Sequence, residues 1–298
     1  MKTRVQVLLS TYNGEKFLNE QLQSLYAQEG VDVALLVRDD GSTDSTYAIL
    51  AAEQAAGRLT WYTGENLKPA FSFWNLVQRA PEMPYYAFCD QDDVWDCDKL
   101  KAATEMLSAA GDAPALYFSQ TRLVDASLKE IGNVKISPLL TFGEALSYQF
   151  VTGCTMVMNS AMRNILLNYT PTFIRMHDVW IYDVAQAVGA RLFFDAQPHI
   201  SYRQHGGNAV GQERFLEQWK RRFVRTAKGE CIRSRLAREL LNGYSALMPA
   251  ENLALATMAA SYKENFSLWV RLLFTGKMRC ASLGINISSK LAILLRKF

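Results

Sequence analysis

Three carboxylates stand within four residues of the chain, at Asp90, Asp92 and Asp93, directly after a short apolar run that is typical of a buried strand. Carboxylates this close together repel one another unless a cation or hydrogen-bond donors compensate them. Their hard oxygen atoms suit Mg²⁺ or Mn²⁺, above all an ion that also bridges to a diphosphate. The alternative is an acidic loop in water, but the apolar Phe88 and Trp95 on either side favour a metal site.

A second acidic pair, Asp39 and Asp40, follows an earlier apolar run and opens a Gly-Ser turn. A carboxylate in this position can accept a hydrogen bond from a nucleobase imide N–H or from a ribose hydroxyl. The alternative is a turn with a helix cap, for which the same residue types are well suited. Both interpretations can hold together, with Asp39 binding and Thr43 or Asp44 capping. Tyr12, just after the first apolar run, is placed to stack on a base.

These side chains need a scaffold that brings strand ends together, and the first hundred residues predict one. Apolar runs of strand type alternate with helical patterns, which implies parallel strands joined by right-handed helical crossovers. In such sheets ligands bind outside the carboxyl ends of the strands, where the acidic residues fall. Strands are predicted at residues 5–9, 33–37, 59–62 and 85–89, and helices at 18–26, 45–56 and 70–79.

Beyond residue 98 the pattern is mixed, and from about residue 212 it is mainly helical and basic. We therefore place a soft boundary near residue 210. Residues 1–210 form the predicted catalytic domain, with a nucleotide half at 1–97 and an acceptor half at 98–210, and residues 211–298 form a helical C-terminal region. Helices are predicted near 99–110, 161–167 and 179–188, and extended segments near 116–124, 151–157, 191–194 and 199–202.

Three motifs in this order resemble those of glycosyltransferase family 2, whose members are inverting enzymes of GT-A fold that use nucleotide-diphosphate sugars. They are Ser-Thr-Tyr-Asn at 10–13, Asp-Asp-Gly-Ser-Thr-Asp at 39–44 and Asp-Gln-Asp-Asp-Val-Trp at 90–95. The resemblance covers roughly residues 4–206. It implies an α/β fold of GT-A type, in which a Rossmann-like nucleotide-binding sheet is followed by the basic helical region.

The resemblance also implies roles for the residues at the strand ends. Thr11 and Tyr12 would flank the base, and Asp90 would approach the ribose. Asp92 would hold the metal ion, Mg²⁺ or Mn²⁺, with Asp93 helping to position the sugar or the metal. The predicted donor-binding residues are Thr11, Tyr12, Asp39, Asp40, Asp90, Asp93, Gly153 and Arg203.

Two downstream segments extend the resemblance. Gly153 resembles the small residue beneath the donor sugar, although a glycine in a core strand is an equally good interpretation. Asp178 opens a predicted helix, where a carboxylate is electrostatically stabilised, so it is either a capping residue or the catalytic base. The resemblance favours Asp178 as the base that accepts the proton of the acceptor hydroxyl, with His177 as the second candidate.

The segment Tyr-Arg-Gln-His at 202–205 resembles the rhamnosyltransferase-like subgroup of the family. It implies that His205 is a metal ligand or a diphosphate contact and that Arg203 neutralises phosphate. One departure is Asn-Leu-Lys-Pro at 66–69, where the family commonly has Asn-x-Gly.

The composition excludes several other classes of protein. The chain has 298 residues, of which 49% are hydrophobic and 20% charged, as in an ordinary globular protein. Its five cysteines form no C-x-x-C pair, so neither a disulfide framework nor a cysteine zinc site is indicated. No apolar run approaches the roughly 18 residues of a membrane span, and the run at 5–9 is too short for a signal peptide. We therefore expect a cytoplasmic protein.

The net charge of +3 hides an asymmetry: residues 1–218 carry 17 basic and 25 acidic side chains, and residues 219–298 carry 15 basic and 4 acidic ones. In the basic part Trp, Phe and Leu alternate with Lys and Arg, as in the run 219–223. Such helices can lie in a membrane interface, or they can pack on the catalytic domain with solvated basic side chains. Nucleic acid is the least favoured partner, because no nucleic-acid-binding module accompanies the charges.

Together these expectations describe a metal-dependent glycosyltransferase that inverts the sugar by direct displacement, with Asp178 as the base. The resemblance implies bacterial surface polysaccharide or O-antigen synthesis at the inner face of the cell membrane, on a saccharide or polyprenyl-linked acceptor. It implies dTDP-rhamnose as the donor, with a UDP-hexose or UDP-N-acetylhexosamine as the alternative. A nucleotidyltransferase is disfavoured by the lack of a Gly-rich basic phosphate loop, and a non-catalytic nucleotide-sugar-binding protein by the presence of the base and the three carboxylates.

Overall fold

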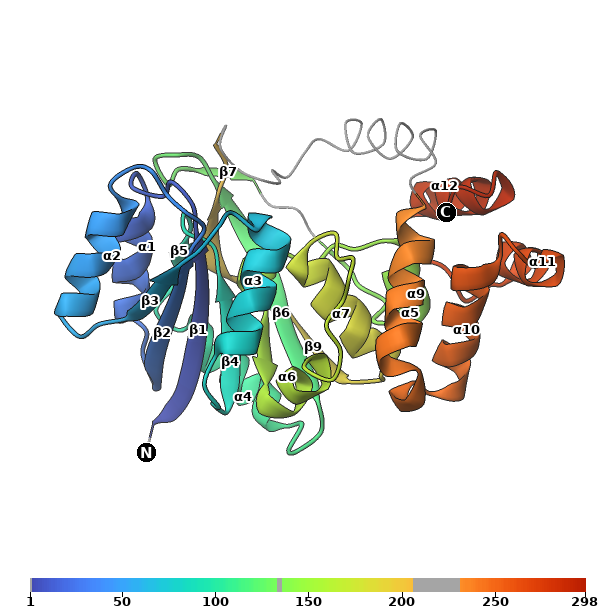
Figure 1. The fold of residues 1–298 in the computed structure, drawn as a ribbon, viewed down its shortest axis with the longest axis horizontal. Coiled ribbons are helices and arrows are strands. Elements are labelled where there is room, and N and C mark those ends of the chain that lie inside the picture. The colour runs from blue at the N-terminus through green and yellow to red at the C-terminus, as the bar shows by residue number, and fades with distance from the viewer. Residues whose placement is uncertain (1, 133–135, 206–230) are drawn as a thin grey trace.

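The computed structural model describes residues 2–132, 136–205 and 231–298, which fold around one mixed β-sheet (Figure 1). The strand order in these residues is β3-β2-β1-β4-β8-β6-β9-β5, with β7 paired to β6. The strands are β1 (Thr3–Thr11), β2 (Val31–Asp39), β3 (Thr60–Thr63), β4 (Tyr85–Cys89), β5 (Val94–Trp95), β6 (Ala115–Val124), β7 (Glu130–Gly132), β8 (Val157–Asn159) and β9 (Arg191–Arg203).

Helices cover both faces of this sheet. On one face, α1, α2 and α4 share a core with β1 and β2; on the other, α3, α6 and α7 share a core with the C-terminal helices. The helices are α1 (Leu18–Tyr26), α2 (Thr46–Ala55), α3 (Lys68–Arg79), α4 (Lys99–Ser108), α5 (Phe142–Ser147), α6 (Ser160–Leu166), α7 (His177–Ala187), α9 (Ile232–Tyr244), α10 (Ala250–Ser261), α11 (Phe266–Phe274) and α12 (Leu283–Leu294).

The first four strands are parallel, which confirms the prediction from the alternating pattern. Their register brings the motif residues to one edge: Thr11 lies opposite Asp39, and Leu9 lies opposite Cys89, the residue before Asp90. The interior of β1 is fully buried between the two helix layers, which explains its continuous apolar run.

Two extended segments differ from the expectation. Residues 151–157 were predicted to be extended, but Gly153–Thr155 form a 3₁₀ turn, closed by a hydrogen bond from the Thr155 N–H to the Thr152 carbonyl, and the short β8 follows antiparallel to β4. The predicted segments 191–194 and 199–202 belong to one long strand, β9. The strand is continuous because its pairing with β6 resumes after an irregularity at Gln120.

The C-terminal helices pack on the catalytic part rather than standing apart (Figure 1). The hydroxyl of Tyr244 donates to the Leu166 carbonyl at 3.0 Å, and the Asn252 amide donates to the Gln186 carbonyl at 3.0 Å. No helix in the described ranges is long and apolar enough to cross a bilayer. The boundary that we expected at residue 210 and the basic run at 219–225 lie outside the described residues.

Candidate functional site

The loops after β1 and β4 are joined by Gln91, which lies between the first two carboxylates of the acidic motif. Its Oε1 accepts from the Thr11 hydroxyl at 2.6 Å and from the Tyr12 N–H at 2.8 Å, and its amide donates to the Tyr12 carbonyl at 3.2 Å. Gly14 allows this approach, because a Cβ there would lie 2.5 Å from that oxygen. The sequence pattern did not single out Gln91, although its place inside the acidic motif was a signal.

Asp39 ends β2 with a carboxylate that its own turn holds in place. Its Oδ2 accepts from the N–H groups of Gly41 and Ser42 and from the Thr63 hydroxyl, and its Oδ1 accepts from the Ser42 hydroxyl at 2.5 Å. A carboxylate has about four lone-pair positions, two on each oxygen, so Oδ1 has capacity for one further donor. The turn therefore orients Asp39 at the edge of the sheet where a base imide N–H is expected.

Asp40 was expected to contact the nucleotide, but its partner in the structure is Arg38. It forms an ion pair with Arg38, and both side chains are buried. The Arg38 guanidinium also donates to the Ser72 hydroxyl and to the Glu65 carbonyl, so it ties β2 to α3 and its preceding loop. Asp40 is thus a structural partner of Arg38 and is not among the residues that we propose to contact the nucleotide.

Two carboxylates of the acidic motif, those of Asp90 and Asp93, lie in an environment that disfavours their charge. Burial, with the neighbouring charges of Asp92 and Asp178, raises the pKa of Asp90 to about 7. Burial and the charges of Asp92 and Asp90 raise the pKa of Asp93 well above its usual value. In the described residues the Oδ2 atom of Asp93 is buried without a hydrogen-bond partner. Crowded anionic oxygens of this kind are stabilised by a cation, by hydrogen-bond donors or by protonation of one carboxylate.

The donor set at this position fits a divalent cation. Ligand atoms of Asp90, Asp93 and Cys154 all lie within 4.8 Å of one another. Beside them Asp92 contacts His205, with 2.8 Å between Oδ2 and Nε2, so the structure brings together the two residues predicted to hold the metal. The sequence analysis assigned no role to Cys154; its thiol interacts with Asp93 and is buried.

A buried lysine, also missed by the sequence analysis, lies behind these carboxylates. Lys99 is fully buried, its Nζ lies 3.6 Å from the ring centroid of Trp95, and among the described residues this nitrogen has no hydrogen-bond partner. Burial lowers the pKa of Lys99 to about 8, against the opposing influence of Cys154, Cys89 and Asp93. Lys99 thus adds a positive charge close to the acidic motif.

Arg203 holds the acidic loop from inside the protein. Its guanidinium is buried, forms an ion pair with Glu20, and donates to the carbonyl oxygens of Asp92 at 2.7 Å and Ala126 at 2.5 Å. Its backbone N–H donates to Asp93 at 3.1 Å. This arrangement differs from the phosphate contact expected from the sequence, because the charge that would neutralise a diphosphate is directed at protein oxygens. Arg203 therefore positions the motif, and we do not include it among the donor contacts.

Asp178 lies in the first turn of α7 and reaches the same site. The N–H groups of Val179 and Gly153 donate to its carboxylate, and its charge acts on Asp90. Burial raises the pKa of Asp178 to about 6, against these hydrogen bonds and the charge of Arg175. A carboxylate with this pKa is ionised at neutral pH and is a stronger proton acceptor than an ordinary aspartate.

His177, the second candidate for the base, is buried beneath the site. Its ring lies 3.9 Å from that of Phe73 and 5.5 Å from that of Phe88, and in the described residues neither ring nitrogen has a hydrogen-bond partner. Burial lowers the pKa of His177 to about 3. Because a group with so low a pKa accepts a proton poorly at neutral pH, the geometry ranks Asp178 above His177.

Gly153 is required by the position of His177, and this gives a first prediction. A Cβ on Gly153 would lie 2.4 Å from the His177 Nε2 atom, so Gly153→Ala should lower the melting temperature. In a His177→Ala background the same change should cost much less, because the colliding ring is gone. The measurement is a double-mutant cycle by thermal denaturation. Additive effects of the two changes would show that the close approach is not the cause.

The fold and the site together define a class. A parallel nucleotide-binding sheet that continues into an antiparallel part, with acidic residues at the strand ends and a further carboxylate facing them, is the GT-A arrangement of glycosyltransferases. Residues 6–167, more than half of the chain, match the model of the family "Glycosyl transferase family 2". The chain belongs to this family.

Two curated proteins and one solved structure illustrate what the chain is similar to. It is 29% identical to the dTDP-rhamnosyl transferase RfbG of Shigella flexneri, over 72% of this chain and 77% of the relative. It is 24% identical to the UDP-Glc:alpha-D-GlcNAc-diphosphoundecaprenol beta-1,3-glucosyltransferase WfgD of Escherichia coli, over 60% and 68%. The mannosyltransferase PcManGT of Pyrobaculum calidifontis, solved with GDP-Man and Mn²⁺, superposes with a TM-score of 0.55 at 16% identity, covering 100% of this chain and 87% of that one.

Proposed function

We propose that this glycosyltransferase moves a sugar from a nucleotide-diphosphate donor to an acceptor hydroxyl with inversion, and that Asp178 is the base. The observation that carries the proposal is the position of Asp178, close enough to Asp90 for their charges to interact and hydrogen-bonded by Gly153. A donor bound at the strand ends would place its anomeric carbon between the acidic motif and α7. An acceptor hydroxyl beside Asp178 would then attack from the side opposite the diphosphate.

The donor nucleotide would lie at the ends of β1, β2 and β4. Tyr12, which is exposed, would stack on the base, Asp39 would accept the base imide N–H through Oδ1, and Asp90 would accept from the ribose. The bridge from Gln91 keeps Thr11 and Tyr12 at a fixed distance from the acidic motif. These contacts orient the donor before the reaction, which lowers the entropic cost of reaching the transition state.

The metal ion, which we propose to be Mg²⁺ or Mn²⁺, would be held by Asp92 with His205, and Asp93 would complete the acidic set. When bound, it supplies positive charge to the leaving diphosphate. Arg203 holds these acidic residues in position, because its backbone N–H donates to the Asp93 carboxylate and its guanidinium donates to the Asp92 carbonyl.

Asp178 would take the proton of the acceptor hydroxyl as the acceptor oxygen bonds to the anomeric carbon. The bond from that carbon to the diphosphate oxygen breaks in the same displacement, so the nucleoside diphosphate leaves with the bonding electrons. The N–H groups of Val179 and Gly153 hold the Asp178 carboxylate in place and leave it lone pairs that can accept the proton.

The proposed donor is dTDP-rhamnose, and the similarity to RfbG supports it. A UDP-hexose or UDP-N-acetylhexosamine is the second candidate, supported by the similarity to WfgD. The proposed acceptor is a saccharide on a polyprenyl diphosphate, at the inner face of a bacterial membrane, in the synthesis of a surface polysaccharide such as O-antigen. The name of WfgD, which acts on a diphosphoundecaprenol-linked sugar, supports this class of acceptor.

Thermal-shift measurements with nucleotide sugars and Mn²⁺ test the donor, because a ligand that binds only the folded state raises the melting temperature. We expect dTDP-rhamnose to give the largest increase and the product mixture to contain a new glycoside and free dTDP. A larger increase in melting temperature with a UDP-sugar would show that the donor is a UDP-sugar and not dTDP-rhamnose. Formation of a nucleotide sugar and pyrophosphate, or binding without turnover on any offered lipid-linked saccharide, would contradict the transfer itself.

A further inference from the structure

The last helix, α12, carries an exposed apolar stripe along its length. Leu283, Ile287, Leu291, Leu294 and Leu295 are each 41–75% exposed. They follow one another at steps of four, four, three and one residues, so they lie on one side of a helix with 3.6 residues per turn. Large apolar side chains that gather in this way mark a surface that binds something apolar.

The opposite side of α12 is firmly packed, so the stripe is not the result of a detached helix. Ile285, Ser289, Ala292 and Ile293 are buried. The Lys290 ammonium donates to the carbonyl oxygens of Leu272, Leu273 and Thr275 at the end of α11, at 3.2, 2.6 and 2.7 Å. These bonds fix α12 to α11 with the stripe facing outward.

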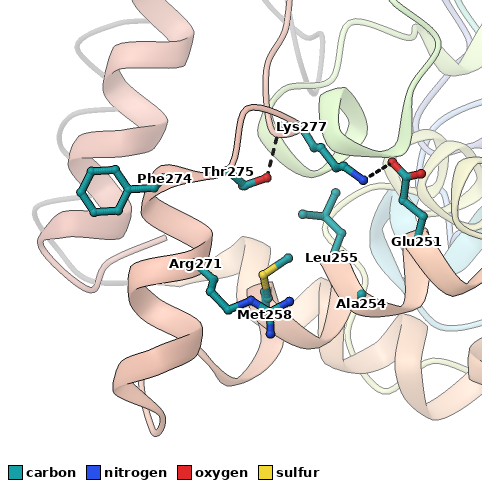
Figure 2. A pocket seen from close by; sticks show the side chains of 8 residues that line it. All are labelled: Glu251, Ala254, Leu255, Met258, Arg271, Phe274, Thr275 and Lys277. Carbon is teal, nitrogen blue, oxygen red and sulfur yellow. Dashed lines mark hydrogen bonds and ion pairs between the residues drawn. The ribbon is translucent and has the colours of Figure 1, made fainter.

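α11 adds two exposed aromatic rings and a pocket to the same end of the molecule, opposite α2 (Figure 1). Phe266 and Phe274 are 68% and 78% exposed. A pocket of about 390 Å³ lies between α10 and α11, with Leu255 and Met258 among the residues that line it. Arg271 and Phe274 also line this pocket, and in Figure 2 the Phe274 ring is directed away from the other labelled side chains.

The charge of this region decides which partner fits. Residues 265–298 contain six basic side chains and no acidic one. Lys277 is paired with Glu251 at 2.8 Å, but in the part of the chain that the structure describes Arg271 and Arg279 form no ion pair. A second copy that presented the same face would place like charges against each other, whereas an anionic lipid surface complements both the basic and the apolar side chains.

We propose that the outward face of α11 and α12, formed by Phe266, Phe274 and the stripe of α12, is a docking surface for anionic phospholipid. The docking proposal depends on the proposed function in one respect, which is that a polyprenyl-linked acceptor places the enzyme at a membrane. α12 lies parallel to the bilayer, with its leucine and isoleucine side chains among the acyl chains and with the exposed Arg271 and Arg279 at the headgroups. The pocket beside α11 offers apolar walls and the Arg271 guanidinium to a lipid at the rim.

The test is cosedimentation of the full-length protein with vesicles of phosphatidylcholine alone or mixed in equal parts with phosphatidylglycerol. The variant is Ile287→Glu with Leu291→Glu, two exposed positions on the stripe. The matched control is Ile131→Glu with Leu167→Glu, which places the same charge at exposed apolar positions elsewhere. We expect the stripe variant to lose roughly tenfold or more of its partition onto the mixed vesicles and the control to lose much less.

Three further measurements distinguish a failure of the docking proposal from a failure of the proposed function. The stripe variant should keep the wild-type melting temperature, the donor-induced shift and turnover on a water-soluble acceptor, since neither residue lies at the catalytic site. Wild-type protein that does not sediment with the mixed vesicles, or a stripe variant that sediments like the wild type, would overturn the proposal. So would a wild-type dimer in analytical ultracentrifugation that the stripe variant alone converts to a monomer, because a second copy would then cover the surface.

Discussion

Replacing Asp178 with asparagine is expected to lower kcat by roughly 10²–10⁴-fold, the range for loss of a general base, and to leave the affinity for the donor nearly unchanged. Asparagine keeps the shape of the side chain and an oxygen that can still accept from the Val179 N–H. What it loses is the negative charge that accepts the proton. Single-turnover kinetics and the donor-induced thermal shift measure the two effects separately.

The pH dependence of the wild type checks the same assignment. Because burial raises the pKa of Asp178 to about 6, the carboxylate is ionised at pH 7.5 and becomes protonated as the pH falls through 6. The rate should then drop about tenfold for each pH unit below that value, and the Asp178→Asn variant should lack this limb. If turnover persists in Asp178→Asn while His177→Ala is inactive, the roles of the two residues are the reverse of those proposed.

Replacing Asp92 with alanine should abolish metal binding and lower turnover by roughly 10²–10³-fold, because a bound cation supplies several kcal/mol of charge stabilisation to the leaving group. The change removes the carboxylate that contacts His205, and with it one of the two residues that we propose as the main ligands of the cation. Electron paramagnetic resonance of free Mn²⁺ measures the binding, and EDTA should abolish wild-type turnover in parallel.

The matched control is Asp112→Ala, an exposed carboxylate outside the acidic motif, which should bind Mn²⁺ and turn over like the wild type. Full wild-type activity after exhaustive chelation would show that the reaction needs no divalent cation. Normal Mn²⁺ binding by Asp92→Ala would instead assign the ion to Asp90, Asp93 and Cys154.

The sequence predicted the parallel half of the sheet because each strand there is a continuous apolar run between helices of clear 3.6-residue period. β4 occupies residues 85–89 as predicted, and α3 and α7 begin within two residues of the expected positions. β8 was missed because it has three residues and is defined by its pairing with β4 and β6 rather than by any pattern of its own.

At the site, the motifs predicted which residues gather at the strand ends but not how their side chains are used. Arg203 illustrates the limit, since its partner Glu20 lies 183 positions away in the chain and no local pattern links them. Arg38 lies near the end of β2 and Asp40 directly follows that strand, yet only the buried geometry shows that they neutralise each other. Tertiary contacts of this kind decide whether a charged side chain meets a ligand or the protein.

The shared core of the C-terminal helices and α7 has a consequence for the size of the acceptor. α9 packs against α7, the helix that carries Asp178, and α5 holds the loop before α12 so tightly that a Cβ on Gly143 would lie 2.0 Å from the Lys277 carbonyl oxygen. If the outward face of α12 lies on a bilayer, as we propose, these contacts would hold Asp178 at a fixed distance from the lipid. We would then expect transfer to depend on acceptor length, and to be fastest when the terminal hydroxyl of the acceptor reaches Asp178 at that distance.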